Sequence, residues 1–299
     1  MCGRYASSRG HEELVAEFEV TQDHLDHLEE GRAVEAKYNI APTDTVPVVI
    51  ERLERTAADQ TDVFDVDALV TAALADDAQH EARAVRQLRS LRWGLVPSWS
   101  KDASGGARMI NARLETLLDK PAFKKAALSR RCLVPADGWY EWQVSPTEKD
   151  AKGKPRKQPF FMRPADGSPG LALAGIYEFW RERAADPDDP AAWLVTFAVI
   201  TTAAEPGLDT IHDRMPLVLP KDRWADWLDP EVKAADDVRD LTIGLPAGRF
   251  SALPITTRVN SVRNDGPALL EPAPADSLIG VVDPATGELL GGPVEDSLF

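Results

Sequence analysis

The sequence predicts one α+β domain, in which a mainly antiparallel, twisted and barrel-like sheet is flanked by a few helices. Segments typical of strands outnumber amphipathic helical segments. The connections between the strand segments are too short to hold the helices of repeated βαβ units. The 299 residues show no internal repeat and no clean linker. We therefore expect one domain over residues 1–270 and a loosely ordered acidic tail over 271–299.

Hydrophobic spacing at intervals of three and four residues predicts the helices. Leu14 and Phe18 share one helical face, and Trp224 and Trp227 share another that we expect to face inward. Pro121 starts or interrupts a basic helical segment. The predicted helices cover residues 11–19, 21–29, 115–131 and 222–228.

Short apolar or alternating runs predict the strands. Residues 171–177 and 193–201 are apolar without alternation, which is typical of strands buried on both faces. Pro47 favours a sheet edge, and the turn residues 135–138 suggest a hairpin. The predicted strands cover residues 46–50, 91–95, 132–134, 139–142, 160–162, 171–177, 193–201 and 251–259.

The net charge of −15 argues at first against a nucleic-acid partner, but the charge is unevenly distributed. Residues 59–81, 186–189 and 271–299 contain 16 acids and no Lys or Arg. Without them the chain has 33 acidic and 34 basic residues. Residues 108–131 and 149–163 are locally basic, either as solvated faces or as a groove for nucleic acid.

The alanine-rich, acidic stretch 51–84 has poor periodicity, so we expect a surface insertion there. No run of 18 apolar residues predicts a membrane span, and the polar start predicts no signal peptide. Cys2 and Cys132 are too few for a disulfide framework. We expect a reduced, cytoplasmic monomer without a membrane partner, a metal or another cofactor.

Removal of Met1 would make Cys2 the first residue, with a free α-amine and a thiol on one carbon skeleton. Their reference pKa values are about 7.7–8.0 and 8.5, so both are partly nucleophilic near neutral pH. A 1,2-aminothiol condenses with an aldehyde to an imine, and intramolecular attack by sulfur then closes a thiazolidine. A small buried residue at position 2 is the commoner use of such a cysteine.

Four polar residues interrupt apolar segments and are candidates for chemistry. Glu141 should share a face with Trp139, and an aromatic environment raises the pKa of a carboxyl. His212 could act as an acid or base, and Asn111 and Arg113 could hold an oxyanion or a phosphate. Each also has an ordinary structural interpretation, as a solvated strand residue or an exposed loop residue. Trp93 and Trp99 could stack on bases, although tryptophan more often packs in a core.

Together these segments resemble one known family. The motifs, in order along the chain, are MCGRY, YNIAPT, RWGLVPSW, INARLET, CLVPADGWYEW, PFFM, ALAGIYEFW, ITTAAEP and IHDRMPLVL. This order is similar to that of the SRAP family, the abasic-site-processing proteins of bacteria and eukaryotes. The resemblance runs from residue 2 to about 270. The sequence departs from the family pattern near 51–84, 145–157 and 182–191 and in the tail, always between motifs.

The resemblance implies capture of abasic sites in single-stranded DNA, through a thiazolidine cross-link between Cys2 and the aldehyde of the opened sugar. It implies that Asn111 and Glu141 hold the amine and the sugar, and that His212 protonates the ring oxygen. The DNA-contacting residues that it implies are Arg4, Asn39, Pro42, Trp93, Trp99, Arg113, Thr201 and Arg214. The family is also associated with DNA repair in the SOS response, with lyase and self-processing peptidase activity, and with the nucleoid during DNA damage.

Two alternatives stay open from the residues alone. Glutamine amidotransferases with an N-terminal nucleophile also begin Met-Cys-Gly, but the chain contains no Asn-Gly-Asp motif of the kind that binds glutamine there. A non-covalent single-strand-binding scaffold would use the basic segment 115–131, and Cys2 would then be structural.

Overall fold

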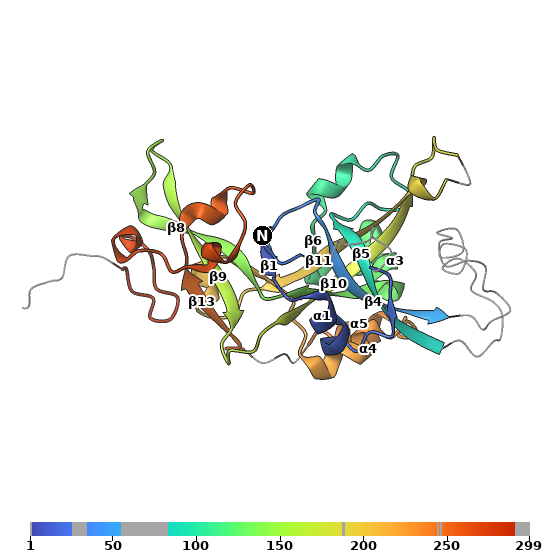
Figure 1. Cartoon of the computed structure of the whole chain (residues 1–299). Coiled ribbons are helices and arrows are strands. Elements are labelled where there is room, and N and C mark those ends of the chain that lie inside the picture. Colours follow the sequence, from blue (N-terminus) through green and yellow to red (C-terminus); the bar gives the residue numbers. More distant parts are fainter. Residues whose placement is uncertain are drawn as a thin grey trace, which may run out of the picture.

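The computed structural model describes residues 2–25, 35–54, 83–186, 189–243, 245 and 247–290. Two sheets lie side by side, and the amino-terminal end of the chain lies between them (Figure 1). The predicted α+β class with a barrel-like sheet is confirmed.

The first sheet is antiparallel throughout, with strand order β13-β9-β8-β1-β3. Its strands are β1 (Tyr5–Ser7), β3 (Lys37–Ile40), β8 (Gly138–Lys149), β9 (Pro155–Pro164) and β13 (Phe250–Pro254). The shortest strand, β1, lies between β3 and β8, with Tyr5 opposite both Ile40 and Trp139. The residues just before Tyr5 are therefore held at the centre of the molecule.

The second sheet closes on itself. Its order is β12-β11-β10-β7-β4-β5-β2, and β5 also pairs with β11, so β11, β10, β7, β4 and β5 form a closed ring. Short β6 adds a parallel pairing to β11. The strands are β2 (Gln22–Asp23), β4 (Thr45–Glu54), β5 (Arg83–Trp93), β6 (Asn111–Arg113), β7 (Arg131–Ala136), β10 (Leu171–Arg181), β11 (Trp193–Ala203) and β12 (Arg214–Pro216).

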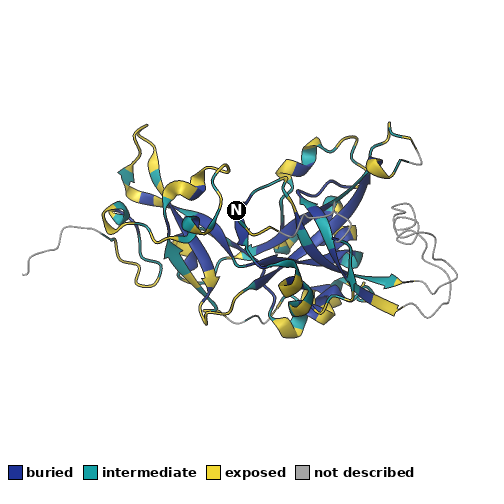
Figure 2. Cartoon of the chain, in the orientation of Figure 1, coloured by how far each residue is buried: buried dark blue, intermediate teal, exposed yellow. Residues whose placement is uncertain are grey.

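Strand β10 shows why these strands are apolar without alternation. Leu173 and Tyr177 pack into one hydrophobic cluster, which also contains side chains of the first sheet and Cys2. Ala174 and Ile176, on the other face, pack into a second cluster beneath the helices. Both faces are buried, as the dark strands in Figure 2 show, so neither can carry the polar half of an alternating pattern.

Helices cover the outer face of the ring. They are α1 (His11–Glu17), α3 (Pro121–Ser129), α4 (Trp224–Leu228) and α5 (Ala235–Asp240). Leu14 of α1 and Trp227 of α4 are completely buried, and the Phe18 ring stacks on Trp224 with centroids 4.5 Å apart. Such an aromatic pair contributes about 0.5–1.5 kcal/mol beyond its buried area. The predicted inward faces of the first and last helical segments are confirmed.

Several predicted elements differ from the structure. Residues 22 and 23 form β2 rather than a helix, and residues 26–34 lie outside the described part of the chain. The basic segment 115–131 contains α3 but begins as the 3₁₀ helix Leu114–Thr116 and ends inside β7. The last strand ends at Pro254, where a proline cannot donate to a ladder, instead of continuing to 259.

The expected hairpin around residues 135–138 is also wrong. Strand β7 pairs with β10 and β4, whereas β8 pairs with β1 and β9, so the chain crosses between the sheets at this turn. The backbone N–H of Asp137 donates to the carbonyl of Ala6 (2.7 Å), which brings β1 against the crossing point. Pro47 pairs with Ser90 of β5 on one side only. Its other side has no partner in β7, because only Val49 and Ile50 of β4 pair with that strand.

The predicted acidic insertion has narrower limits than 51–84. Strands β4 and β5 pair with each other at both ends of this stretch, at residues 51–54 and 83–84. Residues 55–82 lie outside the described residues.

Part of the predicted loose tail is packed. Val281 is completely buried in the same cluster as Cys2. The Gln143 side chain donates to the Val282 carbonyl (2.9 Å) and accepts from its N–H (2.7 Å), and Ser145 Oγ donates to the Gly280 carbonyl (2.6 Å). The residues around Val281 therefore pack against β8, and this packing was not evident from the acidic composition of the segment.

Replacing Gly138 with Ala should destabilise the protein. An added Cβ would overlap the Met162 carbonyl oxygen and lie 2.5 Å from Phe161 Cζ. We expect a loss of about 1–3 kcal/mol in the free energy of unfolding, measured by chemical denaturation. Gly105→Ala is the matched control, because the nearest atom to its Cβ is Met109 Cε at 3.9 Å. Equal stability of the two variants would show that the crossing point tolerates a side chain.

Candidate active site

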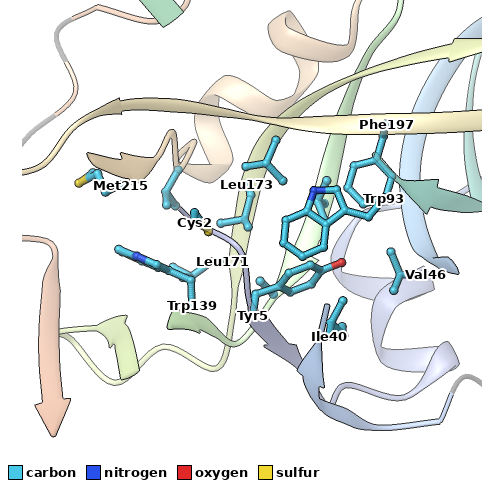
Figure 3. Close-up of a cluster of buried hydrophobic side chains, with 14 of the residues drawn as sticks. Cys2, Tyr5, Ile40, Val46, Trp93, Trp139, Leu171, Leu173, Phe197 and Met215 are labelled. Carbon is cyan, nitrogen blue, oxygen red and sulfur yellow. The ribbon is translucent and has the colours of Figure 1, made fainter. Parts of the chain in front are cut away.

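Cys2 is completely buried where the two sheets meet. Figure 3 shows its side chain near Trp139, Leu171 and Met215, on the opposite side of the cluster from Val46. Asn111 Nδ2 donates to the Cys2 carbonyl (2.7 Å). Because β6 pairs with β11, with Asn111 opposite Val199, this ladder fixes the position of Asn111.

Glu141 lies on β8 and is 3% exposed. It is opposite Phe160, and Trp139 precedes it by two residues on the same face, as the sequence predicts. Burial raises the pKa of the Glu141 carboxyl to about 7, although the positive charge at the amino terminus opposes the shift. A carboxyl with this pKa exchanges protons readily at neutral pH.

His212 follows the 3₁₀ helix Leu208–Thr210, and its backbone N–H donates to the Leu208 carbonyl (3.1 Å). Its Nδ1 accepts from the backbone N–H of Arg214 (3.0 Å), and Asp213 Oδ1 lies 2.9 Å from the same nitrogen. The first contact suits a neutral ring and the second a protonated one. Burial and the amino-terminal charge lower the pKa of the imidazole, which favours the neutral ring at pH 7.

Electrostatic effects connect the groups of the candidate site. Burial raises the pKa of the Cys2 thiol well above its ordinary value, and the Glu141 charge adds to the increase. The amino-terminal charge acts on Cys2, Glu141 and His212 alike, and the Asp213 charge also raises the pKa of Glu141. The structure therefore brings together all four residues expected to be catalytic.

Some buried polar atoms near Cys2 have no hydrogen-bond partner within the described part of the chain. Asn111 Oδ1 and Trp139 Nε1 are among them. Buried polar atoms are usually paired, so an acceptor and a donor left over in one region are suited to a polar ligand.

The expected DNA-contacting residues divide into exposed and supporting groups. Arg113 is exposed, and its guanidinium makes no hydrogen bond or ion pair with another described residue. Trp99 is 62% exposed, and Pro42 is half-buried in the turn between β3 and β4. Thr201 is buried and presents its carbonyl to Arg214 Nη2 (2.6 Å).

Arg4 and Asn39 hold a loop in place. Arg4 Nη1 donates to Asn39 Oδ1 (2.6 Å) and to the Val259 carbonyl (3.0 Å). Asn39 is buried, and its Nδ2 donates to the carbonyls of Ser261 (3.0 Å) and Asn264 (2.8 Å). The amide of Asn39 thus supports the loop 259–264 rather than facing solvent.

Trp93 corrects the expectation that it stacks on a base. It has no exposed surface, its Nε1 donates to the Ile110 carbonyl (2.9 Å), and its ring contacts Tyr5 edge-on at 5.3 Å (Figure 3). The inward direction follows from its position on β5, where alternate residues fill the ring. The commoner role of tryptophan, core packing, applies here.

Sequence reasoning missed Glu115, an acidic residue within the locally basic segment 108–131. Both of its carboxylate oxygens accept from Arg214, at 2.6 Å (Nη1) and 2.9 Å (Nη2). The available signal was its position two residues after Arg113 in the INARLET segment.

Comparison with known proteins agrees with this arrangement. The family model described as SOS response associated peptidase (SRAP) matches residues 1–262. The chain belongs to the SRAP family. It is 32% identical over 272 residues to the abasic site processing protein YoqW of Bacillus subtilis (strain 168), with 91% of this chain and 99% of that protein covered. It is 30% identical to the abasic site processing protein YedK of Escherichia coli (strain K12), with 91% of this chain and 100% of that protein covered. It is also 30% identical to the abasic site processing protein HMCES of Gallus gallus, with 91% of this chain and 78% of that protein covered.

Solved structures support the fold. A protein from Bacteroides thetaiotaomicron superposes with a TM-score of 0.66 at 20% identity, over 91% of this chain and 100% of that one. A phage-related protein from Bordetella bronchiseptica gives a TM-score of 0.51 at 28% identity, over 86% and 95% of the two chains. Among the described residues, no helix is long and apolar enough to cross a membrane.

The two tryptophans should respond differently to truncation. Trp93→Ala removes a fully buried ring, so we expect a loss of about 3–5 kcal/mol in the free energy of unfolding. Trp99→Ala removes an exposed ring and should change it by less than about 0.5 kcal/mol. Denaturant titrations of both variants measure the difference. A stable Trp93→Ala protein would contradict the assignment of Trp93 to the core.

Proposed function

We propose that the protein is an abasic-site sensor. It binds single-stranded DNA and, after removal of Met1, forms a thiazolidine between Cys2 and the aldehyde of an abasic site. The observation that carries this proposal is the convergence of Glu141, Asn111 and His212 on Cys2, whose position would become the amino terminus. The printed names of the relatives, abasic site processing proteins, support the same function.

The proposed reaction balances without an oxidant or a reductant. The Cys2 amine attacks the aldehyde carbon, and the carbinolamine loses water to give an imine. The thiol then adds across the C=N bond, with sulfur on carbon and the proton on nitrogen, and the five-membered ring closes. The amine thus reacts in the first step and the thiol in the second, and the ring that forms holds both the nitrogen and the sulfur of Cys2.

Glu141 accepts the proton that the attacking amine releases and returns a proton when the carbinolamine loses water. Its pKa of about 7 suits it to both directions. Asn111 holds the Cys2 carbonyl and so fixes the amine, and its unpaired Oδ1 is available to the sugar. In its protonated form, His212 donates a proton to the ring oxygen of the closed sugar, which opens the sugar to the aldehyde.

The DNA path uses positive charge and an aromatic surface. Arg113 contacts a phosphate, Arg214 adds positive charge near it, and Arg4 is a further basic residue of the path. Trp99 stacks on an unpaired base, which needs no sequence readout. Pro42, Asn39 and Thr201 shape and support this path. A peptidase activity, which the family description names, would use the same Cys2 and His212, and so would the lyase and self-processing activities that the resemblance implies.

The first test mixes the Met1-processed protein with single-stranded DNA that carries one abasic site, followed by denaturing gel and intact-mass analysis. We expect a heat-stable adduct whose mass is the sum of protein and DNA less one water. Cys2→Ser, Cys2→Ala and undamaged DNA should give none. Binding without any adduct would support the scaffold alternative, and hydrolysis of glutamine would support an amidotransferase.

The pH dependence of adduct formation tests the role of Glu141. With a pKa of about 7, the carboxylate fraction rises about tenfold between pH 6 and pH 8. The wild-type rate should therefore rise by about ten times the increase that deprotonation of the Cys2 amine alone would give. Glu141→Gln should lower the rate by about 10²–10⁴-fold and abolish this inflection, leaving that of the amine near 8. The measurement is single-turnover adduct formation on denaturing gels.

Glu271→Gln, which removes an exposed carboxyl, should behave as wild type. A Glu141→Gln protein with the wild-type rate and pH profile would exclude Glu141 as the proton acceptor.

A further inference from the structure

The ion pair between Glu115 and Arg214 has the geometry of a phosphate contact. Both Nη atoms of Arg214 donate to the two oxygens of Glu115, at 2.6 and 2.9 Å, and Nη2 also donates to the Thr201 carbonyl (2.6 Å). Paired donors on a planar guanidinium bind carboxylates and phosphates in the same bidentate way. Glu115 therefore occupies the face of Arg214 that a phosphate would use.

Glu115 lies on the solvent side of this pair. The side chain of Arg214 is 12% exposed, whereas that of Glu115 is 51% exposed. Arg214 Nε is buried and has no hydrogen-bond partner among the described residues, so this nitrogen does not offer a second contact to solvent. Glu115 therefore holds the pair of Nη donors that an anion would bind.

The pair adjoins the candidate active site. The backbone N–H of Arg214 donates to His212 Nδ1 (3.0 Å), and Arg113 lies beside Thr201 in the parallel register of β6 and β11. Arg113 is exposed and close enough for its charge to act on Glu115. When single-stranded DNA contacts Arg113, the neighbouring Arg214 is therefore already paired with the carboxylate of Glu115.

We propose that Glu115 is a specificity-determining residue, which takes the place of a DNA phosphate on Arg214 and so weakens the binding of undamaged single strands. This inference rests on the proposed function. A phosphate must displace Glu115 to engage Arg214, and the net gain of that exchange is small. An abasic strand is retained by its covalent bond to Cys2, whereas an undamaged strand has only the weakened electrostatic contacts and dissociates.

The test measures the affinity for an undamaged, fluorescently labelled oligothymidylate by anisotropy over a series of salt concentrations. Glu115→Gln should bind about three- to tenfold more tightly than wild type at low salt, and the slope of log K against log[salt] should steepen by about 0.7, the value for one additional phosphate contact on a single strand. The ratio of adduct formation on abasic DNA to retention on undamaged DNA should fall.

Asp119→Asn is the matched control, because it removes an exposed carboxylate from the same segment that makes no ion pair among the described residues. It should tighten binding much less than Glu115→Gln. A double-mutant cycle with Arg214→Gln then shows whether the gain passes through Arg214, because the gain should disappear in the Arg214→Gln background.

Three results would overturn the inference while leaving the proposed function intact. They are equal affinities of Glu115→Gln and Asp119→Asn, weaker binding by Glu115→Gln, and a gain that persists without Arg214. If wild type binds no single-stranded DNA at any salt concentration, the proposed function fails and this inference fails with it.

Discussion

Strand β11 forms ladders with β10, β12, β5 and β6, and the candidate site depends on these pairings. Its pairing with β5 closes the ring and its pairing with β6 positions Asn111, while β12 begins two residues after His212. The apolar side chains of β11 fill both hydrophobic clusters, so a shift by one residue would exchange the side chains of the two clusters and disrupt the packing of both. The geometry around Cys2 is thus set by the register of a buried strand rather than by flexible loops.

Burial has a second consequence at the site, because it changes the charge state of the groups it encloses. Burial raises the pKa of the Glu141 carboxyl and lowers the pKa of the His212 imidazole. Both shifts favour the uncharged form of the group near pH 7. The positive amino terminus partly offsets the rise in the pKa of Glu141, and it adds to the decrease in the pKa of His212. Outside this buried region, Arg214 and Glu115 form a partly solvated pair that can exchange partners at low cost.

The sequence was informative where one physical cause dominated. Uninterrupted apolar runs predicted β10 and β11 correctly, and the alternation of Trp139 and Glu141 predicted the environment of that carboxyl. It was uninformative where distant segments decide the outcome. The turn at Asp137 resembles a hairpin locally, but β1 inserts beside β8 and separates the two strands. Trp93 and Trp99 are indistinguishable as tryptophans, and only ring closure assigns one to the core. Val281 lies in an acidic segment whose packing depends on Gln143, far away in the chain.

The burial of Cys2 also bears on the order of events during synthesis. The amino terminus leaves the ribosome first, whereas β8, β11 and the stretch around Val281 that enclose Cys2 are made much later. At about 5–20 residues per second, the roughly 200 residues through β11 take about 10–40 s to translate. During that interval Cys2 cannot yet have its final neighbours. Removal of Met1, which the proposed function requires, would therefore take place on the nascent chain, before the domain folds around Cys2.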